Sequence, residues 1–354
     1  MTPAPSRPLL RALAGSEAVE ALFSNEAELA ALLEVEAALA AAMAGCGLID
    51  AGTAARIATA CGSFAPDWDR LAAGLSKDGV VVPELVRQLR AAVGEPDAAS
   101  VHTGATSQDI VDTALMLRLK RATTIYAARL DALVAALRHL EARDGALPLM
   151  AHTRMQQALP FTAADKLQTW RAPLERQAAG LQALIPRVLA LQLGGPVGTR
   201  TDFGGKGDAV AAAMAAALGL ADAPCWHTQR DRIAEFASWL SVTSGVLGKI
   251  GQDIALMAQN EVAEVRLAAG GGSSAMPHKS NPVGAEVLVA LARLNAGLLG
   301  TLHQALVHEN ERSGAAWTLE WLVLPQMAVA TAAGLDRACA LFEGLRFAPS
   351  VTAP

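Results

Sequence analysis

Apolar residues recur every three or four positions along most of the chain, the spacing of helices that bury one face. Ser24, followed by Asn-Glu, forms a capping pattern that predicts the start of the first of them. No stretch shows the convincing alternation of apolar and polar residues that is typical of a half-buried strand. The expected helices cover approximately residues 25–44, 54–61, 83–93, 109–119, 126–143 and 162–184.

The longest apolar seam lies between Pro224 and Pro277, where no other proline interrupts it. It predicts a helix of roughly 40 residues and about 60 Å. A helix of that length exceeds what a small globular core needs, so it indicates an elongated bundle. The seam positions are Ile233, Phe236, Leu240, Thr243, Leu247, Ile250, Ile254 and Met257.

These patterns predict an all-α fold, an elongated antiparallel helical bundle with a small N-terminal helical domain. The Gly-Glu-Pro-Asp turn at 94–97 closes the N-terminal part. The expected division is therefore residues 1–98 for the N-terminal domain and 99–354 for the bundle.

Composition and charge narrow the possible partners. Of the 354 residues 52% are hydrophobic but only 4% are aromatic, so alanine supplies much of the apolar content and closely packed helices are expected. The net charge of -5 argues against a basic surface for nucleic acid or an anionic membrane. An anionic substrate would therefore need a local cationic site.

Four cysteines and the absence of targeting signals indicate a cytoplasmic protein. The cysteines form no pair with metal-ligand spacing, and we interpret them as small core residues in a reducing compartment. The first residues lack a signal-peptide hydrophobic run, and no segment reaches about 18 uninterrupted apolar residues. The cysteines are Cys46, Cys61, Cys225 and Cys339.

A glycine-rich loop at 270–286 concentrates the groups that a catalytic loop needs. Its glycines permit backbone conformations that other residues resist, and two hydroxyls, an imidazole, an ammonium and an amide follow closely. Asn281 and Pro282 then have the pattern of a helix N-cap and first helical position. A plain linker between two helices is the alternative, but the ordered polar string argues against it.

Three further polar segments interrupt the helices. Residues 101–109 lead into a helix, where Thr106 and Asp109 resemble a capping pair whose backbone amides also suit an anion. Residues 150–160 contain a histidine, an arginine and two glutamines. The glycine-rich stretch at 193–207 is a weak match to a phosphate loop, because no strand precedes it. We expect it to line a site or join helices.

Taken together, the motifs resemble those of the fumarase/aspartase superfamily, over nearly the whole chain. The string Gly-Ser-Ser-Ala-Met-Pro-His-Lys-Ser-Asn-Pro at 272–282 is the most specific of them. Within the superfamily the chain is most similar to the 3-carboxy-cis,cis-muconate cycloisomerase family. That closer likeness rests on residues 105–109, 156–160, 226–233 and 311–321.

The resemblance implies a homotetramer with active sites shared between three subunits, a small tricarboxylate substrate, no metal and no organic cofactor. It implies that Ser273 transfers the proton at carbon. Its substrate-contacting positions fall on Thr106, Ser107, Gln108, Ser274, Lys279 and Asn281, with Gln156 in the second motif. Because an ordinary serine is a poor base, Ser273 would need loop amides or Lys279 to stabilise its alkoxide.

The chain departs from the superfamily pattern in two places. In the lyases a histidine follows the threonine of the second motif and works with a glutamate at the position of Glu286, whereas here Arg154 follows Thr153. The chain also ends soon after Phe347, where relatives usually add a third helical domain, so we expect that domain to be absent.

The missing histidine favours cycloisomerisation over elimination. A lyase that expels an amine or hydroxide needs an acid for the leaving group, whereas lactonisation uses a substrate carboxylate that is already ionised. Arg154 would grip a carboxylate or pair with Glu286, and with Lys279 and Arg312 it would form the local cationic site. A bundle salt bridge is the alternative for each of these cations.

Two other functions stay open. A β-elimination lyase of the adenylosuccinate or argininosuccinate type would release fumarate, although the absent histidine argues against it. A helical structural protein that has lost catalysis is the other, although an intact catalytic loop is hard to reconcile with it.

Overall fold

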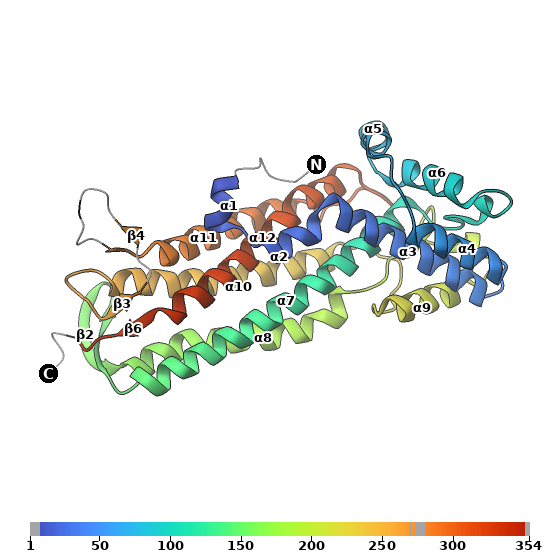
Figure 1. Ribbon diagram of the computed structural model, residues 1–354. Helices are drawn as coiled ribbons and strands as arrows, with labels where there is room; N and C mark the ends of the chain where they lie inside the picture. The colour runs from blue at the N-terminus through green and yellow to red at the C-terminus, as the bar shows by residue number, and fades with distance from the viewer. Residues whose placement is uncertain (1–7, 269–270, 273–275, 277–279, 351–354) are drawn as a thin grey trace.

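The computed structural model describes residues 8–268, 271–272, 276 and 280–350. Within this part of the chain, five long helices lie side by side and form an elongated bundle (Figure 1). The all-α fold class predicted from the sequence is confirmed. The five helices are α7 Ser107–Asp144, α8 Ala163–Val188, α10 Asp231–Met257, α11 Val283–Gln304 and α12 Ala315–Glu343.

The bundle has two ends, which we name by what they carry. At the carboxylate end α7, α10 and α12 begin, and Trp317 of α12 donates to Asp112 of α7. At the hairpin end these three helices finish, and the chain after α10 pairs with the chain after α12. Because α7 has 38 residues, its length alone separates the two ends by about 57 Å.

The predicted seam of α10 is correct but its predicted length is wrong. All eight seam positions are buried, from Ile233 to Met257. The helix ends at Met257 after 27 residues, about 40 Å, because the following residues turn back and form a short strand. Conversely, the two helices expected at 109–119 and 126–143 are one continuous helix, α7.

The N-terminal helices cover the carboxylate end of the bundle. The chain enters α3 Asn25–Gly45 through Ser24, whose hydroxyl accepts from the amide of Ala27 as the capping pattern predicts. Helix α3 packs against α7 and against α9 Gly207–Leu218. The buried core is continuous from α3 to α12, so the division at residue 98 stays a prediction.

Smaller helical segments complete this region. The sequence indicates α4 and α6 but misses α5, in which Leu71 and Gly74 are the buried residues. These helices are α4 Ala51–Gly62, α5 Trp68–Asp78 and α6 Val82–Val93, and the 3-10 turns are η1 Ala21–Phe23, η2 Asp97–Ser100 and η3 Thr201–Phe203. The first two helices, α1 Pro8–Ala14 and α2 Glu17–Glu20, lie instead along α12, where Ser16 donates to Asp336 (Figure 1).

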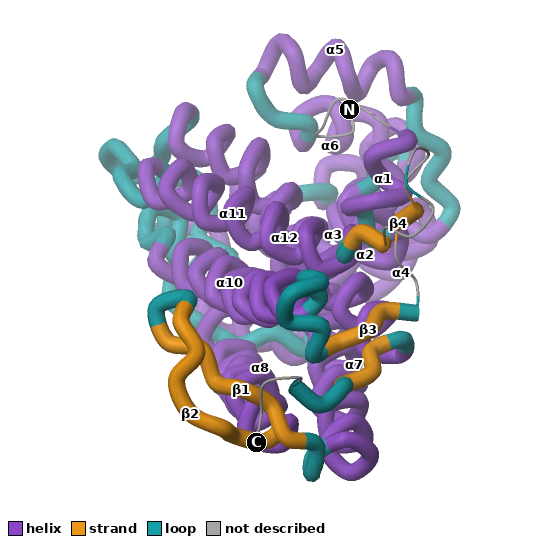
Figure 2. Tube along the Cα trace, turned by 90° about the vertical axis from the view of Figure 1, so that its left-hand side faces the viewer, coloured by secondary structure: helices purple, strands orange, loops and turns teal. Residues whose placement is uncertain are grey.

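A β-hairpin replaces the irregular segment expected at 150–160, so the prediction of no strands is wrong here. Strand β1 Pro148–Thr153 pairs antiparallel with β2 Gln156–Thr162, and the hairpin stands at one end of the bundle (Figure 2). Residues 156–160 are all exposed, which explains why no burial alternation marks them. Two shorter pairs are β3 Val265–Leu267 with β6 Leu345–Phe347, and β4 Gly271–Gly272 with β5 Ser280–Asn281.

Helix α11 is the most exposed apolar element. It begins at Val283, so Asn281 lies in β5 and the predicted N-cap is one residue too early. By length and composition α11 is the one described helix that would suffice to cross a membrane. It packs against α10 and α12, yet only 28% of its most apolar window is buried within the chain. Its outer face, with Leu294 48% exposed, therefore lacks cover in a single chain.

Candidate active site

The polar motifs found in the sequence lie at opposite ends of the bundle. Residues 101–109 lead into the start of α7 at the carboxylate end. Residues 150–160 form the hairpin, and β4 and β5 flank the glycine-rich loop before α11, at the other end (Figure 1). One chain therefore does not bring these motifs together, because α7 holds them about 57 Å apart.

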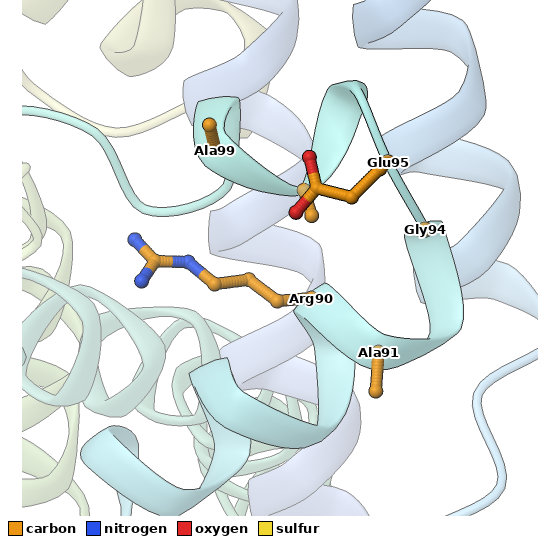
Figure 3. A pocket seen from close by; sticks show the side chains of 6 residues that line it. Arg90, Ala91, Gly94, Glu95 and Ala99 are labelled. Carbon is orange, nitrogen blue, oxygen red and sulfur yellow. The ribbon is translucent and has the colours of Figure 1, made fainter.

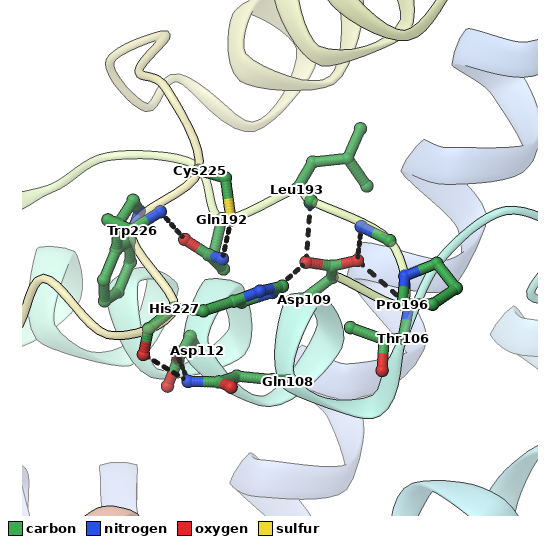
Figure 4. Close-up of polar contacts among 12 residues, drawn as sticks. Thr106, Gln108, Asp109, Asp112, Gln192, Leu193, Pro196, Cys225, Trp226 and His227 are labelled. Atoms are coloured by element: carbon green, nitrogen blue, oxygen red, sulfur yellow. Dashed lines mark hydrogen bonds and ion pairs between the residues drawn. The ribbon is translucent and has the colours of Figure 1, made fainter. Parts of the chain in front are cut away.

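Asp109 is the centre of a buried network at the carboxylate end (Figure 4). Its side chain is 1% exposed and accepts four hydrogen bonds from three segments of the chain. The amides of Gly194 and Gly195 donate at 2.8 Å each, His227 Nε2 lies 2.8 Å from Oδ1, and the Thr106 amide donates at 2.9 Å. The capping role predicted for Asp109 is thus confirmed, and the glycine-rich stretch lines this network.

One helical turn further, Asp112 binds the guanidinium of Arg230. The Nη1 and Nη2 atoms donate at 2.6 and 3.1 Å, and Trp317 Nε1 donates to the same carboxylate at 3.0 Å. Arg230 also donates to both oxygens of Glu320, at 2.9 and 2.5 Å. The three charged side chains are at most 1% exposed, so the two carboxylates depend on this one shared guanidinium where water cannot reach them.

The conformation of the loop before α7 is held by contacts that restrict which residue types can occupy its positions. His102 adopts a positive φ of 63°, and its Nδ1 lies 2.6 Å from the buried Glu36 carboxylate. Gly104 has a φ of 76°, and a Cβ at that position would lie 2.7 Å from the Phe203 ring. The backbone therefore approaches Phe203 at a distance that no other residue type allows.

A cavity of about 370 Å³ lies behind this loop, between the end of α6 and η2 (Figure 3). Arg90 Nη2 donates to the Val101 carbonyl at 3.0 Å, next to His102. None of the site residues predicted from the sequence lines this cavity. The bond to the Val101 carbonyl shows that Arg90 supports the loop. The lining residues are Arg90, Ala91, Gly94, Glu95, Ala98 and Ala99.

The predicted residues at the carboxylate end differ in access. Thr106 and Ser107 are half-buried at the N-terminus of α7, where helix amides favour an anion. Gln108 is fully buried and donates to Asp112 at 3.1 Å and to the His227 carbonyl at 2.9 Å, so its burial argues against direct substrate contact. Arg312 is exposed and donates to the Pro196 carbonyl at 2.8 Å.

At the hairpin end the predicted residues project into solvent. Arg154 and Gln156 are exposed, and Arg154 and Met155 form the hairpin tip with φ values of 50° and 67°. Two-residue hairpin turns of this kind favour asparagine and glycine, so the tip is strained for these side chains. An arm that holds such a conformation while exposing Met155 is built to present its tip to something outside the chain.

The proposed partner of Arg154 lies at the same end but is not bonded to it. Glu286 is exposed in the first turn of α11, and Asn281 is half-buried in β5. Among the described residues no ion pair joins Arg154 to Glu286, so the expected pairing is not formed within the chain. Ser273, Ser274 and Lys279 lie outside the described residues.

His227 lies in the segment 226–233 that carries the family resemblance, but it was not among the predicted site residues. Burial by itself lowers the pKa of His227, but the hydrogen bond to Asp109 and the neighbouring Cys225 sulfur outweigh it and raise the pKa to about 9. The ring is therefore an imidazolium at neutral pH, and its Nε2 is bonded to Asp109. It holds the loop in place and is not a general base. Only the proximity of His227 to Arg230 in the sequence could have suggested its place.

Comparison with known proteins gives one consistent result. A protein-family model described as lyase matches residues 15–294. The chain is 41% identical to 3-carboxy-cis,cis-muconate cycloisomerase of Pseudomonas aeruginosa, over 98% of this chain and 77% of that protein. The crystal structure of 3-carboxy-cis,cis-muconate lactonizing enzyme from Pseudomonas putida superposes with a TM-score of 0.91 at 38% identity, covering 97% and 78% of the two chains. A fumarate lyase from a Mesorhizobium species gives 0.88 at 32% identity, covering 94% and 76%.

Replacing Arg230 with methionine should destabilise the fold strongly. The substitution leaves Asp112 and Glu320 buried without their cation, and removal of one partner of a buried pair costs about 3–5 kcal/mol. The free energy of unfolding, measured in urea at a fixed protein concentration, is expected to fall by that amount.

The matched control is Arg187→Met, which removes an exposed arginine from a surface pair with Glu235. Its effect should be far smaller, because solvent already screens that pair. Equal losses in the two variants would show that burial of the Arg230 cluster does not matter for stability.

Proposed function

The chain belongs to this lyase family, the fumarase/aspartase superfamily, and we propose that within it the protein is a 3-carboxy-cis,cis-muconate cycloisomerase. The enzyme interconverts 3-carboxy-cis,cis-muconate and 4-carboxymuconolactone. A substrate carboxylate oxygen adds to one carbon of the diene, and a proton bonds to the neighbouring carbon. The ionised substrate therefore takes up one proton, and the two compounds are isomers in their free-acid forms. The assignment places the enzyme in protocatechuate breakdown, the β-ketoadipate pathway.

The observation that carries the assignment is Arg154 at the hairpin tip, where the lyase pattern has a histidine. Elimination of an amine or hydroxide needs an acid at the leaving group, whereas the leaving group of lactone opening is a carboxylate that needs none. His227, which is buried at the carboxylate end, is bonded to Asp109 and cannot replace the missing histidine. Only the proton at carbon then requires a protein group.

We assign the residues of the hairpin end to the reaction itself. Ser273 would carry the proton at carbon, with Ser274, Lys279 and Asn281 holding the substrate beside it. Arg154 would grip a substrate carboxylate with two parallel hydrogen bonds, and Gln156 lies next to it on β2. Glu286 stands in the first turn of α11 and would orient one of these cations.

The carboxylate end would supply the other part of the site. Thr106 and Ser107 present hydroxyls at the N-terminus of α7, and Arg312 adds an exposed guanidinium. Gln108 would act through Asp112, because its buried amide bonds to that carboxylate. No step of this reaction calls for a metal or an organic cofactor.

Because the two parts lie about 57 Å apart in one chain, a complete site requires more than one subunit. We propose a homotetramer in which the apolar outer face of α11 is covered by other subunits. The exposed Leu294 and the low burial of α11 within the chain support this arrangement. The assembly would act in the cytoplasm on a small tricarboxylate, without nucleic acid or membrane.

The enzyme should consume 3-carboxy-cis,cis-muconate with loss of the conjugated-diene absorbance. Replacement of Ser273 with alanine is expected to lower kcat by at least about a hundredfold, the usual contribution of a positioned proton-transfer group. Fumarate release from adenylosuccinate or argininosuccinate, with no reaction of the muconate, would instead identify a β-elimination lyase.

Replacement of Arg154 with methionine should raise KM by about 10- to 100-fold while kcat changes little. The substitution removes a charge-assisted hydrogen-bonding group that holds substrate and transition state alike. Arg138→Met serves as the control and should leave KM unchanged. It removes an exposed cation of α7 that is paired with Glu175 of α8. An unchanged KM in the Arg154 variant would refute its role in binding.

Subunits that carry lesions at opposite ends should complement each other. Ser107→Ala and Ser273→Ala are each expected to be poorly active, but in mixed oligomers some sites receive an intact half from each kind of subunit. Activity should return to about a quarter of the wild-type value, because each half is intact in half of the subunits. If mixed oligomers form and activity stays at the level of the separate variants, each site is built from one chain.

A further inference from the structure

A second cavity, of about 400 Å³, opens beside the Asp109 network and is lined in part by Cys225. Cys225 is half-buried and is one of the residues that line the cavity, in the chain segment before α10. The cavity also contains Arg200, which donates to Asp208 at 2.8 Å and to the Ala223 carbonyl at 2.7 Å. Asp222 completes the charged groups of its wall.

The thiol lies against a histidine, one of whose ring nitrogens has no hydrogen-bond partner. His227 is 4% exposed, and its Nε2 is held by Asp109. Its other nitrogen, Nδ1, is buried and has no hydrogen-bond partner among the described residues. The titratable groups that act on this ring are Asp109 on one side and Cys225 on the other.

Gly194 packs against both the thiol and the ring. A Cβ at this position would lie 2.4 Å from Cys225 Sγ and 2.8 Å from His227 Cε1, so only glycine leaves room for both groups on the same side of the chain. On another side, Gln192 Nε2 donates to Sγ at 3.3 Å. The sulfur therefore has a donor and a cationic ring beside it, as a thiolate requires.

The electrostatics agree with this geometry. Burial would raise the pKa of Cys225, yet the hydrogen bonds and charge of His227 outweigh burial and lower it. The other cysteines offer a contrast within the same chain. Burial raises the pKa of Cys61 to about 12 and also raises the pKa of Cys339.

We propose that Cys225 is a modification site, whose sulfur small soft electrophiles reach through the cavity. In an alkylation, Sγ forms a bond to carbon while the thiol proton leaves to solvent and the leaving group departs with its electron pair, and no oxidant or reductant is needed. The charge of His227, which is itself held by Asp109, favours the ionised form of the attacking sulfur. The site is separate from the proposed reaction, and its test requires no substrate.

Iodoacetamide is the probe, applied to the intact native protein, and peptide mass spectrometry measures the alkylation rate of each cysteine. At pH 7 Cys225 should react at least about ten times faster than Cys46 or Cys339, since the thiolate is the nucleophile. Because its pKa is lowered while that of Cys339 is raised, the rate of Cys225 should also reach half of its maximum at a lower pH than the rate of Cys339. Cys225→Ser should abolish the fast reaction and leave the other rates unchanged.

His227→Asn tests the cause, because it removes the imidazolium and keeps a polar side chain. The Cys225 rate at pH 7 should then fall by about tenfold, and its midpoint should move to the higher pH of an ordinary thiol. A wild-type Cys225 that reacts no faster than Cys46 at pH 7 overturns the proposal, whether or not the His227 variant folds.

Discussion

The rest of the structure depends on two carboxylates that α7 buries in its first two turns. Asp109 and Asp112 have no access to solvent, so each must be met by donors from elsewhere in the chain. Those donors come from the glycine-rich stretch, from the residues before α10 and from α12. Burial of these charges therefore fixes where three separate segments meet, and with them the start of three bundle helices.

This constraint leaves the carboxylate end rigid and the hairpin end open. At one end the buried charges are paired and the loop before α7 is closed by Glu36 and Arg90. At the other, an exposed hairpin holds a strained tip that contacts none of the buried core. A rigid carboxylate end and a projecting hairpin suit a site that is completed between subunits. Each end of one subunit then supplies groups that the other end of the same chain cannot reach.

The sequence predicted the helices whose buried faces follow a helical periodicity. It missed the features that depend on tertiary contacts. The seam of α10 was readable because every seam residue is apolar, but its end at Met257 was not, since the residues that follow keep some of the helical pattern. The hairpin was invisible because β2 is exposed on both faces and shows no alternation. Arg230 and Asp112 looked like ordinary polar positions, and Gln108 looked accessible. Burial of such groups depends on partners about 120 residues away.

The distribution of positive charge bears on the proposed anionic substrate, because the chain as a whole has a net charge of -5. Arg230 is shared between two carboxylates and His227 is held by a third, so neither buried cation projects a field that a substrate would feel. Arg154 and Arg312 are exposed, and within the described residues no carboxylate neutralises either of them. They stand at opposite ends of one chain. The two guanidiniums can therefore face one tricarboxylate only where the hairpin end of one subunit meets the carboxylate end of another.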